Sequence, residues 1–247
     1  MGGGSSEGLP EPIRGKLDEL QGRLEAAAGK NLAGLVLYGG LARGRYREGQ
    51  SDVNLMVLLH DTGERSLAAI APVLRAAWQE FRLEPMVLRP ADVIPTAQAF
   101  PLKFLDIQAN HRVLAGADVL LGLAVPQERI RLRAAQELRN LALHLRRRYL
   151  LSYDSAGGLT RVVSKSVVPL SIHMQALLRS DGKPAPLGES LDQLYARAAE
   201  AYGLDAKVLA RIAAAREEAP KNAAGLYQAV LDTVDRLTAV AEVGRWT

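Results

Sequence analysis

The 247-residue sequence contains no cysteine, which excludes disulfide bonds, thiolate metal sites and cysteine nucleophiles. It has only four histidines, and no two of them are spaced as HxxxH, so a histidine-rich metal site is not expected. Any bound metal should therefore be a hard cation held by oxygen ligands. No apolar run approaches the roughly 18 to 20 residues that a membrane span needs, so no membrane partner is expected.

Aromatic residues are also scarce, at 5%, so the core has to be built from Ala, Leu and Val, a composition that favours helices. The net charge of +4 is mildly basic and fits binding of polyanions such as nucleotides or RNA. Residues 1–10 are rich in Gly, Ser and Pro, and we expect them to form a disordered tail. They lack the layout of a signal peptide, so a cytoplasmic protein is expected.

Hydrophobic periodicity changes its character at Pro126. Before this residue, helical spacing in 11–30 and 61–81 alternates with strand-like runs at 32–38, 51–59 and 83–88. After it we find no strand pattern, and helical patterns cover 126–151, 159–179, 188–202, 205–217 and 221–243. The sequence therefore predicts an α+β protein, with an α/β domain at 11–125 and an all-helical bundle at 126–247.

One stretch of the first half combines features of a phosphate site with those of a metal site. The strand-like run 32–38 ends at Gly39-Gly40, and Ser51-Asp52 opens the next strand after a polar loop. Glycines at a strand end let the backbone approach a phosphate, and exposed N–H groups at the following turn bind anions. An acidic residue on the adjacent strand can hold Mg²⁺ over the same phosphates.

This stretch resembles the nucleotidyltransferase superfamily, and in particular its minimal and aminoglycoside-modifying members. The residues that match the motif of the family, in order, are Gly39, Gly40, Ala42, Arg43, Gly44, Ser51, Asp52 and Leu55. The resemblance implies a small mixed sheet with flanking helices. It also implies a nucleotide site formed by Gly39, Gly40, Arg43 and Ser51, with Asp52 as a catalytic metal ligand.

The family also carries a third carboxylate at the start of a later strand, and Glu84 is the candidate here. In that role Glu84 would hold the metal or act as the base that deprotonates the acceptor. The other interpretation is an ordinary exposed glutamate at the edge of a strand, and the sequence does not separate the two.

The sequence departs from the family at the second aspartate of the motif, which is Asn54 here. An asparagine oxygen can still ligate a metal, but it brings no charge and bridges two cations less well. We expect transfer of a nucleoside monophosphate from ATP, with Mg²⁺ or Mn²⁺, to a hydroxyl of a small molecule, a protein or an RNA. The alternative is a degenerate nucleotide-binding protein that regulates or binds a partner; DNA is not expected as a partner.

The first helical pattern of the second half carries a further short motif. Arg139 and His144 match an Arg-x4-His pattern that resembles the catalytic signature of the helical HEPN ribonucleases. The same segment also fits a plain amphipathic helix, and its arginines fit either a solvated face or contact with a nucleotide, an RNA or an acidic partner. Asp106 and His111 follow the third strand and are weaker candidates for the nucleotide site.

Overall fold

The computed structural model describes residues 8–44, 46–49, 51–153, 155, 157–183 and 189–243. The chain divides into two compact units, Met1–Val125 and Pro126–Thr247, and each is described by itself. Most of the expected disordered tail, residues 1–7, lies outside the described residues, whereas Leu9 is buried in a hydrophobic core. Among the described residues, no helix has both the length and the apolar composition that a membrane span requires.

The first unit contains a four-stranded mixed sheet in the order β3-β2-β1-β4. Strand β1 (Leu32–Tyr38) is antiparallel to both β2 (Val53–Leu59) and β4 (His111–Gly116). Strand β2 is parallel to β3 (Leu83–Leu88), and the crossover between them is helix α2 (Glu64–Phe81).

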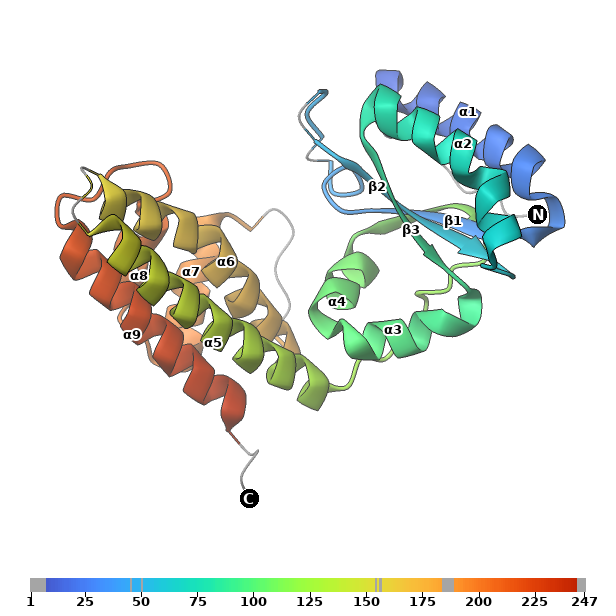
Figure 1. The fold of residues 1–247 in the computed structure, drawn as a ribbon. Helices are drawn as coiled ribbons and strands as arrows, with labels where there is room; N and C mark the ends of the chain where they lie inside the picture. The colour runs from blue at the N-terminus through green and yellow to red at the C-terminus, as the bar shows by residue number, and fades with distance from the viewer. Residues whose placement is uncertain are drawn as a thin grey trace. The chain divides into compact units, whose positions relative to one another are not determined.

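Helices cover both faces of this sheet, because its central strands are apolar on both sides. Helices α1 (Glu11–Ala28) and α2 pack on one face, and the helices α3 (Val93–Ala99) and α4 (Pro101–Ala109) pack on the other (Figure 1). Alternation along β1 sends Leu35 and Leu37 to the first face and Val36 and Tyr38 to the second. Two short 3₁₀ turns, Gly29–Asn31 and Pro90–Asp92, precede β1 and α3.

Every regular element among the described residues of the second unit is a helix. Its helices are α5 (Gln127–Ser152), α6 (Gly158–Ser180), α7 (Leu191–Tyr202), α8 (Ala206–Ala214) and α9 (Ala223–Glu242). A single buried cluster joins all of them, with Leu138, Leu170, Tyr195 and Val234 among its fully buried members. The predicted α+β class, with a mixed sheet, flanking helices and a following helical region, is thus confirmed.

Candidate nucleotide site

The ends of all four strands meet at one edge of the sheet. Strand β1 ends there, and its antiparallel neighbours begin there. The register places Tyr38 opposite both Asn54 and His111, and Asn54 opposite Glu84. The predicted residues Asn54 and Glu84 are therefore neighbours on adjacent strands, which lie about 5 Å apart.

This row of side chains faces the side of the sheet that α3 and α4 cover. Tyr38 and Met56 belong to the core on that side, and Asn54 shares their face by the alternation of β2. Exposure increases along the row, because Tyr38 is buried, Asn54 is half-buried and Glu84 is exposed. Burial raises the pKa of the Tyr38 hydroxyl, and the negative charge of Glu84 raises it further. Glu84 is thus close enough to act electrostatically on the buried end of β1.

Gly39 turns the chain away from β1 immediately beside Asn54. It has a φ of +80°, and a Cβ at this position would lie 2.8 Å from Nδ2 of Asn54. The Arg43 N–H donates to the Gly39 carbonyl, and the Gly44 N–H donates to the Leu41 carbonyl, which makes the turn tight. Within the described residues, no hydrogen bond engages the N–H groups of Gly40, Leu41 and Ala42. Successive N–H groups of this kind suit a phosphate oxygen.

Asp52 lies at the start of β2 and forms an ion pair with Arg82. The Nε and Nη2 atoms of Arg82 each lie 2.8 Å from Oδ1 of Asp52. Arg82 caps the end of α2 in a left-handed conformation, with a φ of 56°, directly before β3. The pairing of Val53 with Leu83 in the parallel register brings the two residues together. The carboxylate of Asp52 is therefore already paired with the Arg82 guanidinium, independently of any metal.

Helix α4 contributes two charged side chains near the same edge. Arg43 forms an ion pair with Asp106. The Lys103 ammonium lies 5.9 Å from the centre of the Tyr38 ring. Lys103 and Asp106 are three residues apart and share a face of α4.

Ser51 closes the polar loop that precedes β2. Its hydroxyl accepts a hydrogen bond from the Arg47 N–H at 3.0 Å, and its own N–H donates to the Arg47 carbonyl at 2.9 Å. These two hydrogen bonds hold Ser51 against Arg47, and Asp52 follows directly in the sequence.

The residues described above bring three carboxylates and three cations to this edge of the sheet. The carboxylates are Asp52, Glu84 and Asp106, and the cations are Arg43, Arg82 and Lys103. Across the described ranges, no three or more carboxylate, imidazole or thiolate groups gather as a metal site. Asp52, Asn54 and Glu84 offer oxygen atoms of the kind that a hard cation prefers, but the neutral Asn54 does not supply the bridging carboxylate that a pair of cations needs.

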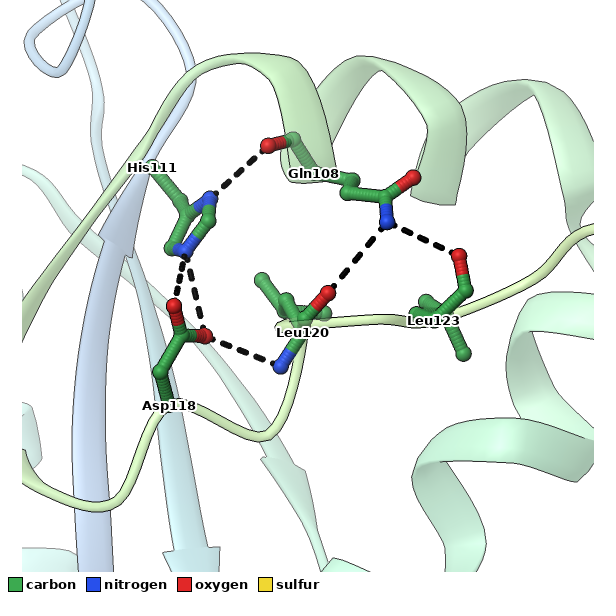
Figure 2. A network of polar contacts seen from close by, with 5 residues as sticks. All are labelled: Gln108, His111, Asp118, Leu120 and Leu123. Carbon is green, nitrogen blue, oxygen red and sulfur yellow. Dashed lines mark hydrogen bonds and ion pairs between the residues drawn. The ribbon is translucent and has the colours of Figure 1, made fainter.

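His111 is fixed by a structural network beside the site (Figure 2). Its Nδ1 lies 3.0 Å from the Gln108 carbonyl and its Nε2 lies 3.1 Å from Asp118. The Gln108 amide donates to the carbonyls of Leu120 and Leu123, and Asp118 accepts from the Leu120 N–H. Burial raises the pKa of Asp118, but hydrogen bonds from His111 and Leu120 outweigh this effect and hold the pKa below its usual value. Both ring nitrogens of His111 are thus engaged in anchoring the segment after β4.

Comparison with known proteins gives a match in structure but not in sequence. No known family matches the sequence, and no curated protein matches it. A solved structure that is similar is spectinomycin adenyltransferase AAD(9) from Enterococcus faecialis with ATP and spectinomycin. The TM-score is 0.55 at 13% identity, and the match covers 90% of this chain and 98% of the other. The chain has the fold of this adenyltransferase.

The helical unit does not bring Arg139 and His144 to one site. Arg139 makes a forked ion pair with Glu242 of α9, with Nη2 at 2.7 and 2.9 Å from the two carboxylate oxygens. His144 instead lines a cavity between α5 and α6. The two residues contact different neighbours, so the contacts do not favour the arrangement that the Arg-x4-His pattern suggested.

The sequence motif does not predict Arg82 and Lys103 as site residues. Both reach the candidate site only through the register of β2 with β3 and the packing of α4 on the sheet. Neither belongs to the motif, and a lone basic residue next to a helix end carries no signal of its partner.

Proposed function

We propose that the chain is a metal-dependent nucleotidyltransferase that transfers a nucleoside monophosphate from ATP to an acceptor hydroxyl. The observation that carries the proposal is the row of Asn54 and Glu84 beside the Gly39 turn and Asp52. The chain that carries this arrangement has the fold of an adenyltransferase that was solved with ATP and spectinomycin. In this proposal residues 11–125 bind the nucleotide, and the helical residues 126–247 hold the acceptor or a partner.

The metal would be held by Asp52 and by the amide oxygen of Asn54, and Glu84 would lie beside it as the base. A bound Mg²⁺ or Mn²⁺ supplies charge neutralisation on the triphosphate and polarises the reacting phosphoryl group. Asp52 keeps Oδ2 for this role while Oδ1 accepts from Arg82. The donor set supports one cation, and Arg82 contributes a fixed positive charge at the same carboxylate.

Other residues of the chain would bind the phosphates and accept the proton of the acceptor hydroxyl. The N–H groups that follow Gly39 would bind phosphate oxygens, and Arg43 and Lys103 would balance their charge. The acceptor oxygen would attack the α-phosphorus, and pyrophosphate would leave as the bond to the α-phosphorus breaks. Glu84 would accept the hydroxyl proton, because it is exposed and stands at the end of the row.

The direct test is calorimetric titration of ATP into the protein with Mg²⁺ and then with EDTA. We expect binding that needs the metal and that Asp52→Asn abolishes. Glu84→Gln should retain ATP binding but lose pyrophosphate release, with spectinomycin as the first acceptor tried. Binding that is indifferent to both the metal and Asp52→Asn would contradict a metal-dependent transferase.

The second candidate function is a nucleotide-binding regulator without transfer activity. The neutral Asn54 and the ion pair that occupies Asp52 favour it. Asn54→Asp separates the two candidates, because the added carboxylate should raise the activity of an enzyme and give none to a regulator. The acceptor of the transferase would be a small molecule, a protein side chain or an RNA end.

A further inference from the structure

A cavity of about 310 Å³ lies between α5 and α6 in the helical unit. The two helices run side by side (Figure 1) and pack against each other. The residues that line the cavity recur at spacings of three and four on each helix, so they form one face of each. Leu141, Leu145 and Val162 give it an apolar surface. A volume of this size is at the lower end of the range for small-molecule pockets.

The charge of the cavity lining is positive. Arg148 of α5 and Lys165 of α6 both line the cavity, and neither forms an ion pair with a described residue. The one carboxylate in the lining, Glu137, is already paired with Arg133 at 2.5 Å. Two permanent cations thus line the cavity from opposite helices without a compensating anion.

One further group in the lining, a ring nitrogen of His173, lacks a hydrogen-bond partner among the described residues. His173 is only 8% exposed, and no described residue offers its Nδ1 a hydrogen bond. Burial lowers the pKa of His173, so the ring is neutral at neutral pH. Pro169 lies inside α6 and has no N–H to donate to the Lys165 carbonyl, four residues earlier. Buried polar groups without partners are uncommon, and they favour a ligand that has polar atoms of its own.

We propose that the cavity between α5 and α6 binds a small organic anion, meaning a carboxylate, sulfonate or phosphate ester with an apolar body. The acidic group would lie between Arg148 and Lys165, and the apolar body would pack on Leu145 and Val162. All the residues involved belong to the helical unit. The proposal goes beyond the nucleotide site and does not depend on it.

The test is a fluorescence titration of the full chain with anilinonaphthalene sulfonate, which joins one sulfonate to an apolar body. Its neutral analogue phenylnaphthylamine is the matched probe. We expect saturable binding of the sulfonate at one site, and affinity about tenfold lower for the neutral analogue. Lys165→Gln and Arg148→Gln should each weaken binding of the sulfonate about tenfold. Arg147→Gln, on the same helix but outside the lining, should leave it unchanged.

Three outcomes would overturn the proposal. Equal affinity for the two probes would show that the acidic group of the ligand does not contribute to binding. Unchanged sulfonate binding in the Lys165→Gln/Arg148→Gln double variant would place the probe elsewhere. Displacement of the probe by a polyglutamate peptide, but not by octyl phosphate, would assign the cavity to an acidic protein segment. Asp52→Asn should leave the titration unchanged, so failure here is distinguishable from failure of the proposed transferase.

Discussion

At Gly39 the chain leaves β1 with a φ of +80°, and the space where a Cβ would lie is 2.8 Å from the Asn54 amide. An alanine would have to adopt a left-handed conformation and also displace Asn54. We predict that Gly39→Ala lowers the free energy of unfolding by roughly 1 to 3 kcal/mol. Equilibrium unfolding in urea measures the change.

Gly22→Ala is the matched control for that experiment. Gly22 lies in the middle of α1, is exposed, and would place a Cβ in open space. This substitution should raise the free energy of unfolding by about 1 kcal/mol, because alanine favours the helix. If both substitutions changed the free energy of unfolding by the same amount and sign, the prediction that residue 39 must be a glycine would be wrong.

Arg82 competes with a cation for Asp52, so its removal should strengthen metal binding. Both side chains are about half exposed, and exposed ion pairs contribute little, so the effect is bounded. We predict that Arg82→Ala raises the affinity for Mn²⁺ in the presence of ATP by up to about fivefold. Calorimetry measures it, and Arg75→Ala on the same helix α2 serves as the control. Weaker metal binding in Arg82→Ala would instead mean that the guanidinium helps to hold the triphosphate.

Among the elements, the long helices could be predicted closely, whereas the short helices α3 and α4 and the edge strand β4 could not. Long amphipathic patterns fix α5 to α9, and a buried apolar run fixes β1. Strand β4 is short, begins with His111 and Arg112, and is held by pairing with the distant β1. Local sequence does not encode that pairing, so the stretch 90–125 could not be resolved into α3, α4 and β4 from the sequence.

The same distinction applies to the candidate site. The motif predicted Gly39, Asp52 and Asn54 because these residues are close in the sequence and can be recognised by residue type and spacing alone. The ion pair of Asp52 with Arg82 depends on the β2–β3 register, and the contact of Lys103 with Tyr38 depends on helix packing. Such partners follow only from tertiary structure, and they determine how much charge remains for a metal.

Within α6, His173 should make the stability of the protein depend on pH. Burial lowers its pKa in the folded chain below the ordinary value of 6.5, so the folded state disfavours the protonated ring. The contribution of the neutral ring is fully present above pH 6.5 and is lost as the pH falls toward the folded pKa. We predict that His173→Gln reduces the loss of stability between neutral and mildly acidic pH. Thermal unfolding of both proteins across this range measures the difference, and parallel curves would contradict the prediction.

On the scale of the whole molecule, each buried cluster of the described residues draws its members from one unit only. The two clusters on either side of the sheet contain only residues up to Val125. The buried members of the third cluster all lie between Ala134 and Ala241, in the second unit. Because hydrophobic burial is the dominant favourable term in folding, each unit carries its own source of stability.

We therefore predict that residues 126–247 fold when they are produced alone. The fragment keeps every member of its core, including Leu170 and Tyr195, so it should show a helical circular dichroism spectrum and one cooperative urea transition. Leu170→Ala should lower its stability by about 2 to 5 kcal/mol, because the side chain is fully buried in that cluster. A helical spectrum without a cooperative transition would show that this core needs the first unit. A cooperative fragment that still binds anilinonaphthalene sulfonate would locate the proposed anion site within it.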